Sequence, residues 1–182
     1  MRTYPAVDLV LRTGTTCELM QQVLDSQLEG AFVCGPVAHA ELETDQVFRE
    51  ELALITAPDM RSIDEALARR DLRIVVLRAG CSYRERLEAI LARRGVAATR
   101  MLEFGTLEAI VGCVGAGLGV TLLPRSLVGT VWSAARVAAH ALPPAEAMVE
   151  TVFIRRRDAF VSSALTAFLA HARPALTRAA AE

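Results

Sequence analysis

The sequence contains no lysine: its 20 basic residues are all arginines, and they are balanced by 21 acidic residues. The resulting net charge of −1 gives the chain no global field that would attract nucleic acid. Long apolar runs are absent as well. No stretch approaches the length of a membrane-spanning helix, and the first residues lack the apolar core of a secretory signal peptide. We therefore expect neither a membrane contact nor export.

Paired metal or disulfide motifs are also missing. The four cysteines show no C-x-x-C spacing, which argues against a zinc ribbon and a disulfide framework, and they are Cys17, Cys34, Cys81 and Cys113. His39-Ala40-Glu41 resembles the H-x-E of zinc deaminases, but no P-C-x-x-C follows it. His140 and His171 have no partners at metal-ligand spacing. We expect a reduced cytoplasmic compartment, no metal and no cofactor.

What the sequence does contain is a regular alternation of strand and helix signals. Its 182 residues, 53% of them hydrophobic, can bury the core of one large domain or of two small lobes. Short apolar runs predict strands at residues 7–11, 31–34, 47–56, 72–77, 100–103, 120–123, 136–142 and 149–154. Amphipathic or capped segments between them predict helices after residues 15, 62, 83, 105 and 162. This alternation predicts an α/β fold with parallel-rich sheets covered on both faces.

Residues 104–128 are the stretch around which the other elements are arranged. Gly105 and Thr106 begin a helix, Gly115 and Gly117 fit its C-cap, and an apolar strand follows at 120–123. The glycine spacing resembles a dinucleotide-binding loop, but that loop must follow a strand and open a helix. Here the glycines close a helix and precede a strand, so the pattern favours capping over nucleotide binding.

Hydroxyl-bearing loops follow three of the predicted strands and open helices. They are Thr13-Gly14-Thr15-Thr16, Cys81-Ser82-Tyr83 and Gly105-Thr106. Free backbone N–H groups and the positive end of the helix dipole favour an anion at such a position, most simply a carboxylate. Ligands of open α/β sheets bind outside the carboxyl ends of strands, so the three loops predict one cleft. Each residue taken singly is also explained as a helix N-cap, and that alternative stays open.

The order of these segments resembles the effector-binding domain of LysR-type transcriptional regulators. The resemblance rests on V-D-L-V-L-R-T-G-T-T, L-E-G-A-F-V-C-G-P-V, E-E-L-A-L-I-T-A-P, R-A-G-C-S-Y-R-E-R-L-E, L-E-F-G-T-L-E-A-I-V-G-C-V-G-A-G-L-G-V-T-L-L-P and T-V-F-I-R-R-R. It covers nearly the whole chain, and G-A-G-L-G-V-T-L-L-P is its most specific part. It implies two Rossmann-like lobes joined by two crossovers, as in type II periplasmic binding proteins, with the effector between them. The Pro breaks at Ala57-Pro58 and Pro143-Pro144 agree with this division.

The resemblance also implies a domain division and a set of contacts. Lobe I would comprise residues 1–56 and 147–182, and lobe II residues 57–146. The implied effector-binding residues are Thr15, Thr16, Cys81, Ser82, Tyr83, Gly105 and Thr106. Members of the family carry an N-terminal helix-turn-helix domain and a first strand and helix that this sequence does not show. DNA would therefore be reached only through that missing domain, and the implied partners are a small carboxylate effector and further copies of the chain.

Other functions fit the residues less well. Cys81 lies near Arg78 and Arg84 at a helix start, a setting that can lower a thiol pKa, but a small residue in the cleft wall is the simpler interpretation. Arg155-Arg156-Arg157 could contact phosphate, although three arginines leaving a strand are usually a solvated end. Ser126 lies outside any G-x-S-x-G motif, and no acid–base pair stands out, so we expect no catalysis. A solute-binding protein of a transport system is the alternative function.

Overall fold

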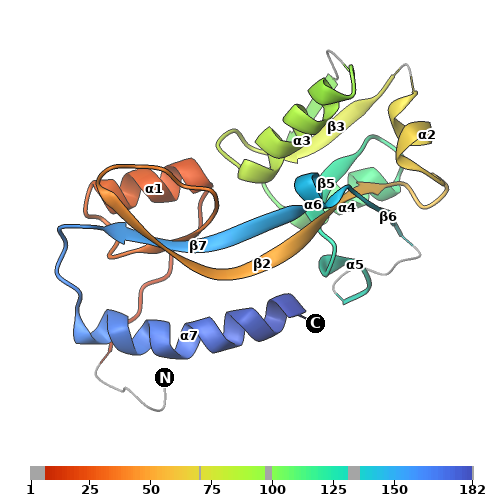
Figure 1. Cartoon of the computed structure of the whole chain (residues 1–182). Coiled ribbons are helices and arrows are strands. Elements are labelled where there is room, and N and C mark those ends of the chain that lie inside the picture. The colour runs from red at the N-terminus through yellow and green to blue at the C-terminus, as the bar shows by residue number, and fades with distance from the viewer. Residues whose placement is uncertain (1–6, 70, 97–99, 131–135, 182) are drawn as a thin grey trace. The chain divides into compact units, whose positions relative to one another are not determined.

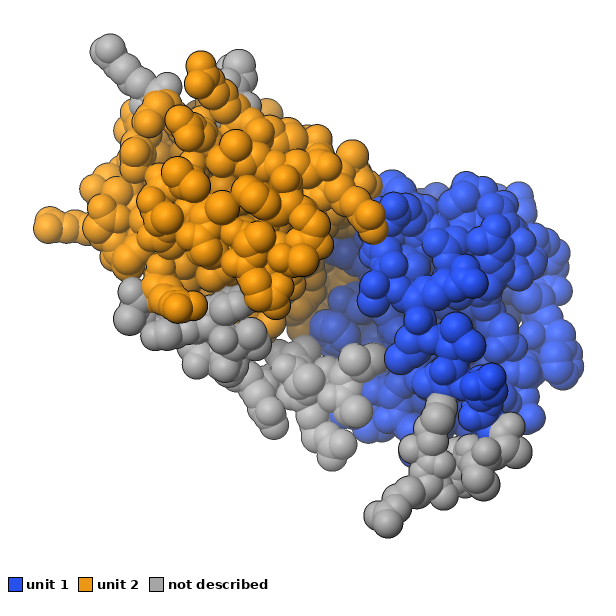
Figure 2. Space-filling model, turned by 180° about the vertical axis from the view of Figure 1, so that it is seen from behind, with its two compact units in different colours: residues 1–48, 151–182 blue, residues 49–150 orange. Residues whose placement is uncertain are grey.

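The computed structural model describes residues 7–69, 71–96, 100–130 and 136–181. These form two compact units, one of residues 1–48 with 151–182 and the other of residues 49–150 (Figure 2). The boundaries fall within the two long strands β2 (Leu42–Thr56) and β7 (Met148–Arg156), which each contribute to both units. The lobe boundaries predicted from the sequence, 56/57 and 146/147, lie close to the ends of the same two strands and stay a prediction.

Unit 1 is a small α/β unit built on β1 (Ala31–Cys34) and the last part of β7. These strands pair antiparallel, with Ala31 opposite Ile154 and Cys34 opposite Thr151. Helix α1 (Thr16–Leu24) lies beside β1, and α7 (Ser163–Ala181) ends the chain (Figure 1). The core of the unit consists of buried apolar residues from α1, β1, β2 and β7, namely Leu19, Val23, Ala31, Val33, Leu42, Val152 and Ile154.

The strand predicted at residues 7–11 is wrong. These residues form no strand, and the side chains of Val10 and Leu11 are 69% and 74% exposed. A strand exists only with a neighbour that completes its backbone hydrogen bonds, and no described strand pairs with this segment. A cavity of about 430 Å³ in unit 1 is lined instead by residues 7–14, by the start of β1 and by apolar side chains of α7.

Unit 2 contains the parallel pairing that the sequence predicts. Strands β3 (Arg73–Leu77) and β4 (Arg100–Phe104) are parallel and in register from Arg73 opposite Arg100 to Leu77 opposite Phe104. On its other side β3 forms a parallel bridge between Ile74 and Val120, just before β5 (Thr121–Pro124). The end of β2 pairs antiparallel with β5 and also with β6 (Ala138–Ala141). Pairing is thus parallel around β3 and antiparallel along β2.

Helices α2 (Ile63–Leu67), α3 (Ser82–Arg93), α4 (Leu107–Gly115), α5 (Leu127–Thr130) and α6 (Pro144–Ala147) complete unit 2 (Figure 1). Its core combines apolar residues of β2, β3, α4 and β5 with Val137, and consists of Ala53, Ile55, Val75, Ile110, Val111, Val114, Leu123 and Val137. Each valine, leucine or isoleucine side chain among them contributes about 1.5–3 kcal/mol when fully buried. Helix α4 thus packs on the sheet through Ile110, Val111 and Val114.

The glycines after α4 serve the backbone. Gly117 has φ +78° and ends the helix, as predicted for a C-cap. Gly115 and Gly119 allow close packing, because a Cβ at these positions would lie 2.7 Å from the Arg136 carbonyl oxygen and 2.5 Å from that of Arg73, respectively. The close approach of Gly119 to Arg73 allows the next residue, Val120, to form hydrogen bonds with β3, and Val75 N donates to Val120 O at 2.9 Å. The glycine-rich pattern is explained by packing and capping.

Candidate functional site

The carboxyl ends of β3 and β4 bring two of the predicted loops to one edge of unit 2. Because Leu77 pairs with Phe104 in a parallel register, the chain leaves both strands at the same edge. Each exit leads into a helix: α3 begins at Ser82 and α4 at Leu107. Two helix N-termini, where the first N–H groups have no intrahelical acceptor, therefore follow neighbouring parallel strands. We call the residues Cys81, Ser82, Tyr83, Gly105 and Thr106 the β3–β4 edge.

The first turn of α3 is fixed by ion pairs from Arg84. Its guanidinium contacts the carboxylate of Glu88 at 3.1 Å along the helix and that of Glu103 on β4 at 2.8 Å. Cys81 is the N-cap residue of α3, but its side chain forms no capping hydrogen bond. The N-cap position of α3 therefore supplies no side-chain oxygen of the kind that usually accepts from an N–H group there.

Tyr83 has a partner that was not predicted from the sequence. Its hydroxyl donates to the Glu50 Oε1 oxygen at 2.6 Å, and Glu50 lies on β2, 33 positions earlier in the chain. Burial raises the pKa of the Glu50 carboxyl, while the hydrogen bond from Tyr83 lowers it by less. Tyr83 also packs against the apolar core of the unit. The structure thus places a partly buried carboxylate in contact with a predicted effector-binding residue.

Gly105 and Thr106 form the other half of the β3–β4 edge. Thr106 is the N-cap of α4, and its hydroxyl accepts a hydrogen bond from Ala109 N at 3.3 Å. Both Gly105 and Thr106 are exposed. The capping interpretation is thus satisfied, and exposure leaves the second lone pair of the Thr106 hydroxyl and its hydrogen accessible to a ligand.

Thr15 and Thr16 belong to unit 1, whereas the other five predicted site residues belong to unit 2. Thr15 forms a complete capping box: its hydroxyl accepts from Glu18 N at 3.3 Å, and its own N–H donates to Glu18 Oε2 at 2.7 Å. Thr15 is buried, and Thr16 is half-buried. Capping is observed here, and the meeting of all seven residues around one effector stays a prediction.

The interior of unit 2 next to Cys81 and Tyr83 has little free space. A cavity of about 10 Å³ lies between these residues, Arg84 and the strands β3 and β5. That volume corresponds to about one water molecule. An effector contacting the β3–β4 edge would therefore lie against its outer surface.

Comparison with known proteins assigns the family. Residues 1–177 match the LysR substrate binding domain. The chain belongs to this family. It is 42% identical over 170 residues to the HTH-type transcriptional regulator GltR of Bacillus subtilis (strain 168), covering 93% of this chain and 57% of GltR. The chain thus spans less than two thirds of the length of this relative.

Solved LysR regulatory domains share the fold. The regulatory domain of Synechocystis PCC6803 CcmR, solved in complex with 2-PG, superposes with a TM-score of 0.77 at 17% identity, covering 97% of this chain and 86% of that one. The effector binding domain of QuiR, solved in complex with shikimate, gives a TM-score of 0.69 at 13% identity, covering 89% and 78%. The predicted fold, an α/β fold like that of type II periplasmic binding proteins, is confirmed.

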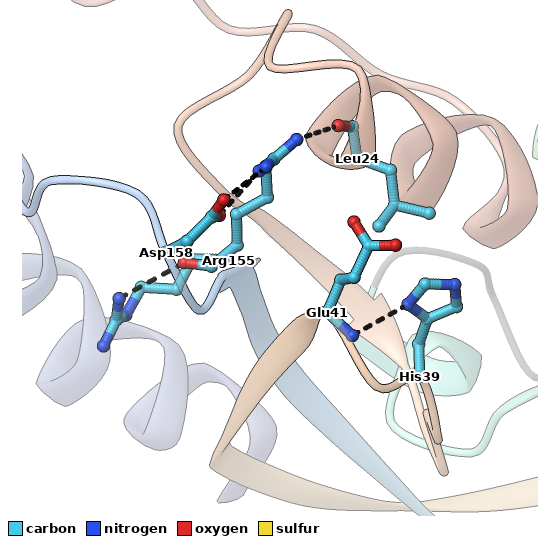
Figure 3. Close-up of polar contacts among 6 residues, drawn as sticks. Leu24, His39, Glu41, Arg155 and Asp158 are labelled. Atoms are coloured by element: carbon cyan, nitrogen blue, oxygen red, sulfur yellow. Dashed lines mark hydrogen bonds and ion pairs between the residues drawn. The ribbon is translucent and has the colours of Figure 1, made fainter.

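Of the three arginines predicted to be a solvated strand end, Arg155 and Arg156 lie in β7 and are half-buried, so the prediction is wrong for these two. Arg157, the residue after β7, is exposed. Arg155 pairs with Glu43, and Arg157 donates to the carbonyl of Leu42 at 3.1 Å. Arg156 donates to the carbonyl of Leu24, at the end of α1, at 2.8 Å and binds Asp158 through two nitrogens (Figure 3). These contacts connect the end of β7 with α1 and the start of β2, because a guanidinium has donors enough for several acceptors.

His39 and His140 of the domain have structural contacts. His39 Nδ1 accepts from Glu41 N at 3.3 Å (Figure 3), and His140 lies 2.8 Å from the buried Thr56 hydroxyl. Burial lowers the pKa of His140.

Within residues 7–69, 71–96, 100–130 and 136–181, no three His, Cys, Asp or Glu side chains gather in a metal-binding arrangement, and no disulfide joins the four cysteines. In the same residues no helix combines the length and apolarity needed to cross a bilayer.

Proposed function

We propose that this chain is the effector-sensing part of a LysR-type transcriptional regulator that acts in the cytoplasm. A small anionic metabolite, in the simplest case a carboxylate, would bind at the β3–β4 edge and also contact Thr15 and Thr16 of unit 1. The observation that carries the proposal is the parallel register of Leu77 and Phe104, which brings two helix N-termini to one edge. The family membership and the relative named a transcriptional regulator support the regulatory role.

The mechanism would be a shift between conformations. An effector changes the equilibrium only if it binds one conformation better than another, so its contacts must differ between the two. In the whole protein the shift would change the geometry of an oligomer and thereby of helix-turn-helix domains on DNA. We propose no catalytic role for the domain. The transport alternative is not favoured, because the relatives are named as transcriptional regulators.

The proposal is tested by titrating the full chain with a panel of small carboxylates that includes shikimate, with 2-PG added as a further probe. Binding is measured by isothermal titration calorimetry and by amide chemical shifts. We expect one or more compounds to shift the amides of Ser82, Tyr83 and Thr106. Heat signals without shifts at these amides would contradict the site, and the absence of both across the panel would contradict the function.

A matched pair of cap variants separates binding from folding. Thr106→Ala and Ser62→Ala each remove a hydroxyl that caps a helix of unit 2, since Ser62 accepts from Glu65 N at 3.1 Å at the start of α2. Each change costs about 1 kcal/mol of stability. Only Thr106→Ala is expected to weaken effector binding. An equal loss of affinity in both variants would mean that Thr106 acts through stability alone.

A further inference from the structure

Glu50 occupies a distinctive position among three consecutive charged residues of β2. Its neighbours Arg49 and Glu51 point to the opposite face of the strand, because side chains alternate along a strand. Arg49 pairs with Glu150 of β7 at 2.6 Å, and Glu51 pairs with Arg125 at 3.1 Å. Glu50 faces the start of α3 instead and accepts the hydrogen of the Tyr83 hydroxyl at 2.6 Å.

The Tyr83 hydroxyl has a single hydrogen to donate. While this hydrogen is donated to Glu50, it cannot be donated to an anion at the β3–β4 edge. An ionised carboxylate only accepts hydrogen bonds, whereas a protonated carboxyl group can donate one. Protonation of Glu50 would therefore reverse the direction of the bond, so that Glu50 donates to the tyrosine oxygen and the tyrosine hydrogen becomes available to a ligand.

We propose that Glu50 is a positioning residue that controls the Tyr83 hydroxyl, so that an anion binds at the β3–β4 edge together with one proton taken up by Glu50. The proposal rests on the proposed function, because it assumes an anionic effector at this edge. It adds that binding is linked to pH and identifies the group responsible. The proton comes from the solvent and is released when the anion leaves.

The surroundings of Glu50 favour this arrangement. Three arginines on β2, on α3 and after β5 form ion pairs with carboxylates other than that of Glu50: Arg49 with Glu150, Arg84 with Glu88 and Glu103, and Arg125 with Glu51. Burial also raises the pKa of the Glu50 carboxyl, which brings its protonation closer to neutral pH. A second negative charge at the edge would raise that pKa further, since like charges disfavour ionisation.

The test is a chemical-shift titration of the full chain with trifluoroacetate, a carboxylate that stays ionised across the range, at several pH values from about 4.5 to 7.5 and constant ionic strength. In the unmodified chain the affinity, read from the amides of Ser82 and Tyr83, is expected to rise as pH falls. One linked proton corresponds to at most a tenfold change in affinity per pH unit. The expected rise levels off below the pKa of Glu50 in the anion-free chain.

Three variants identify the group. Glu50→Gln carries an amide that can donate to Tyr83 at every pH, so its affinity is expected to stay high and to lose the pH dependence. Glu51→Gln changes the neighbouring carboxylate on the opposite face and is expected to behave like the unmodified chain. Tyr83→Phe removes the donor, so affinity at low pH is expected to fall several-fold and its pH dependence to shrink.

The outcomes distinguish the two proposals. A pH dependence that survives in Glu50→Gln, or a Tyr83→Phe variant with unchanged affinity and pH dependence, overturns the proton linkage and leaves the binding site in place. Amides of the edge that never shift, in any variant and at any pH, overturn anion binding at this edge and the linkage with it. Well-dispersed amide spectra of each variant establish that it is folded.

Discussion

The same substitution at two glycines seven residues apart is expected to have opposite effects on stability. Gly112 lies inside α4, it is exposed, and a Cβ added there would have no heavy atom within 4 Å. Gly112→Ala should therefore stabilise the chain by about 0.5–1 kcal/mol, because glycine in a helix costs that much relative to alanine. A Cβ at Gly119 would instead lie 2.5 Å from the Arg73 carbonyl oxygen and 3.0 Å from the Val75 Cγ2 atom.

The cost of Gly119→Ala follows from this contact. Ordinary carbon contacts begin near 3.5 Å, so the backbone must move by roughly 1 Å. Overpacking of this kind costs about 1–3 kcal/mol. The movement also strains the hydrogen bond from Val120 N to Arg73 O, now 3.0 Å, which is worth about 1 kcal/mol. We expect a net loss of about 2–4 kcal/mol.

Urea unfolding followed by far-UV circular dichroism measures both variants. A lower midpoint for Gly119→Ala and a higher one for Gly112→Ala, with unchanged slopes, is the expected result. Equal midpoints would refute the packing explanation of the glycine-rich stretch. A Gly119→Ala variant within about 0.5 kcal/mol of the unmodified chain would do the same, since an effect of that size is typical of a surface position.

Three further predictions concern single polar side chains. Because the pKa of Glu50 is raised in the folded chain, its contribution to stability is complete below its unfolded pKa and is lost as pH rises through the folded pKa. The stability of Glu50→Gln relative to the unmodified chain should therefore increase as pH rises from 4.5 to 7.5. A difference in urea midpoints that stays constant over this range would contradict this. Thr15→Ala should cost about 1 kcal/mol in thermal unfolding through the lost cap, whereas Thr15→Ser should cost less. Arg156→Ala should lower the melting temperature and speed hydrogen exchange at the end of α1, near Leu24, while Arg49→Ala should leave that exchange unchanged.

Short buried strands were predictable from the sequence. The runs at 31–34, 72–77 and 120–123 correspond to β1, β3 and β5 within a residue or two, because an apolar run bounded by turn residues has few other places in a fold. Strand β2 begins five residues earlier than predicted, at Leu42. After Leu42 the added residues are the polar run Glu43–Gln46, of which the last three are exposed, so no apolar pattern marks them. The strand predicted at 7–11 is wrong because an apolar run alone does not make a strand: it also needs a neighbouring strand to pair with.

The candidate site was predictable only in part. Thr15, Ser62 and Thr106 are helix caps, as their residue types and positions indicated, because capping depends on neighbours along the chain. The contact between Glu50 and Tyr83 joins residues 33 positions apart, and no local pattern indicates it. Arg155, Arg156 and Arg157 also contact Glu43 and the carbonyls of Leu24 and Leu42, which are all more than 100 positions earlier in the chain, and no local pattern indicates these contacts.

The contacts of three consecutive residues, Arg49, Glu50 and Glu51, limit the insertions and deletions that β2 can tolerate. Each of the three consecutive side chains is tied to a different part of the chain: β7, the first turn of α3, and the residue after β5. Inserting or deleting one residue before Arg49 would turn every following side chain to the other face, so all three ties would break together. Homologous domains that keep these ties should therefore vary in length before Leu42 or after Thr56, and not in between.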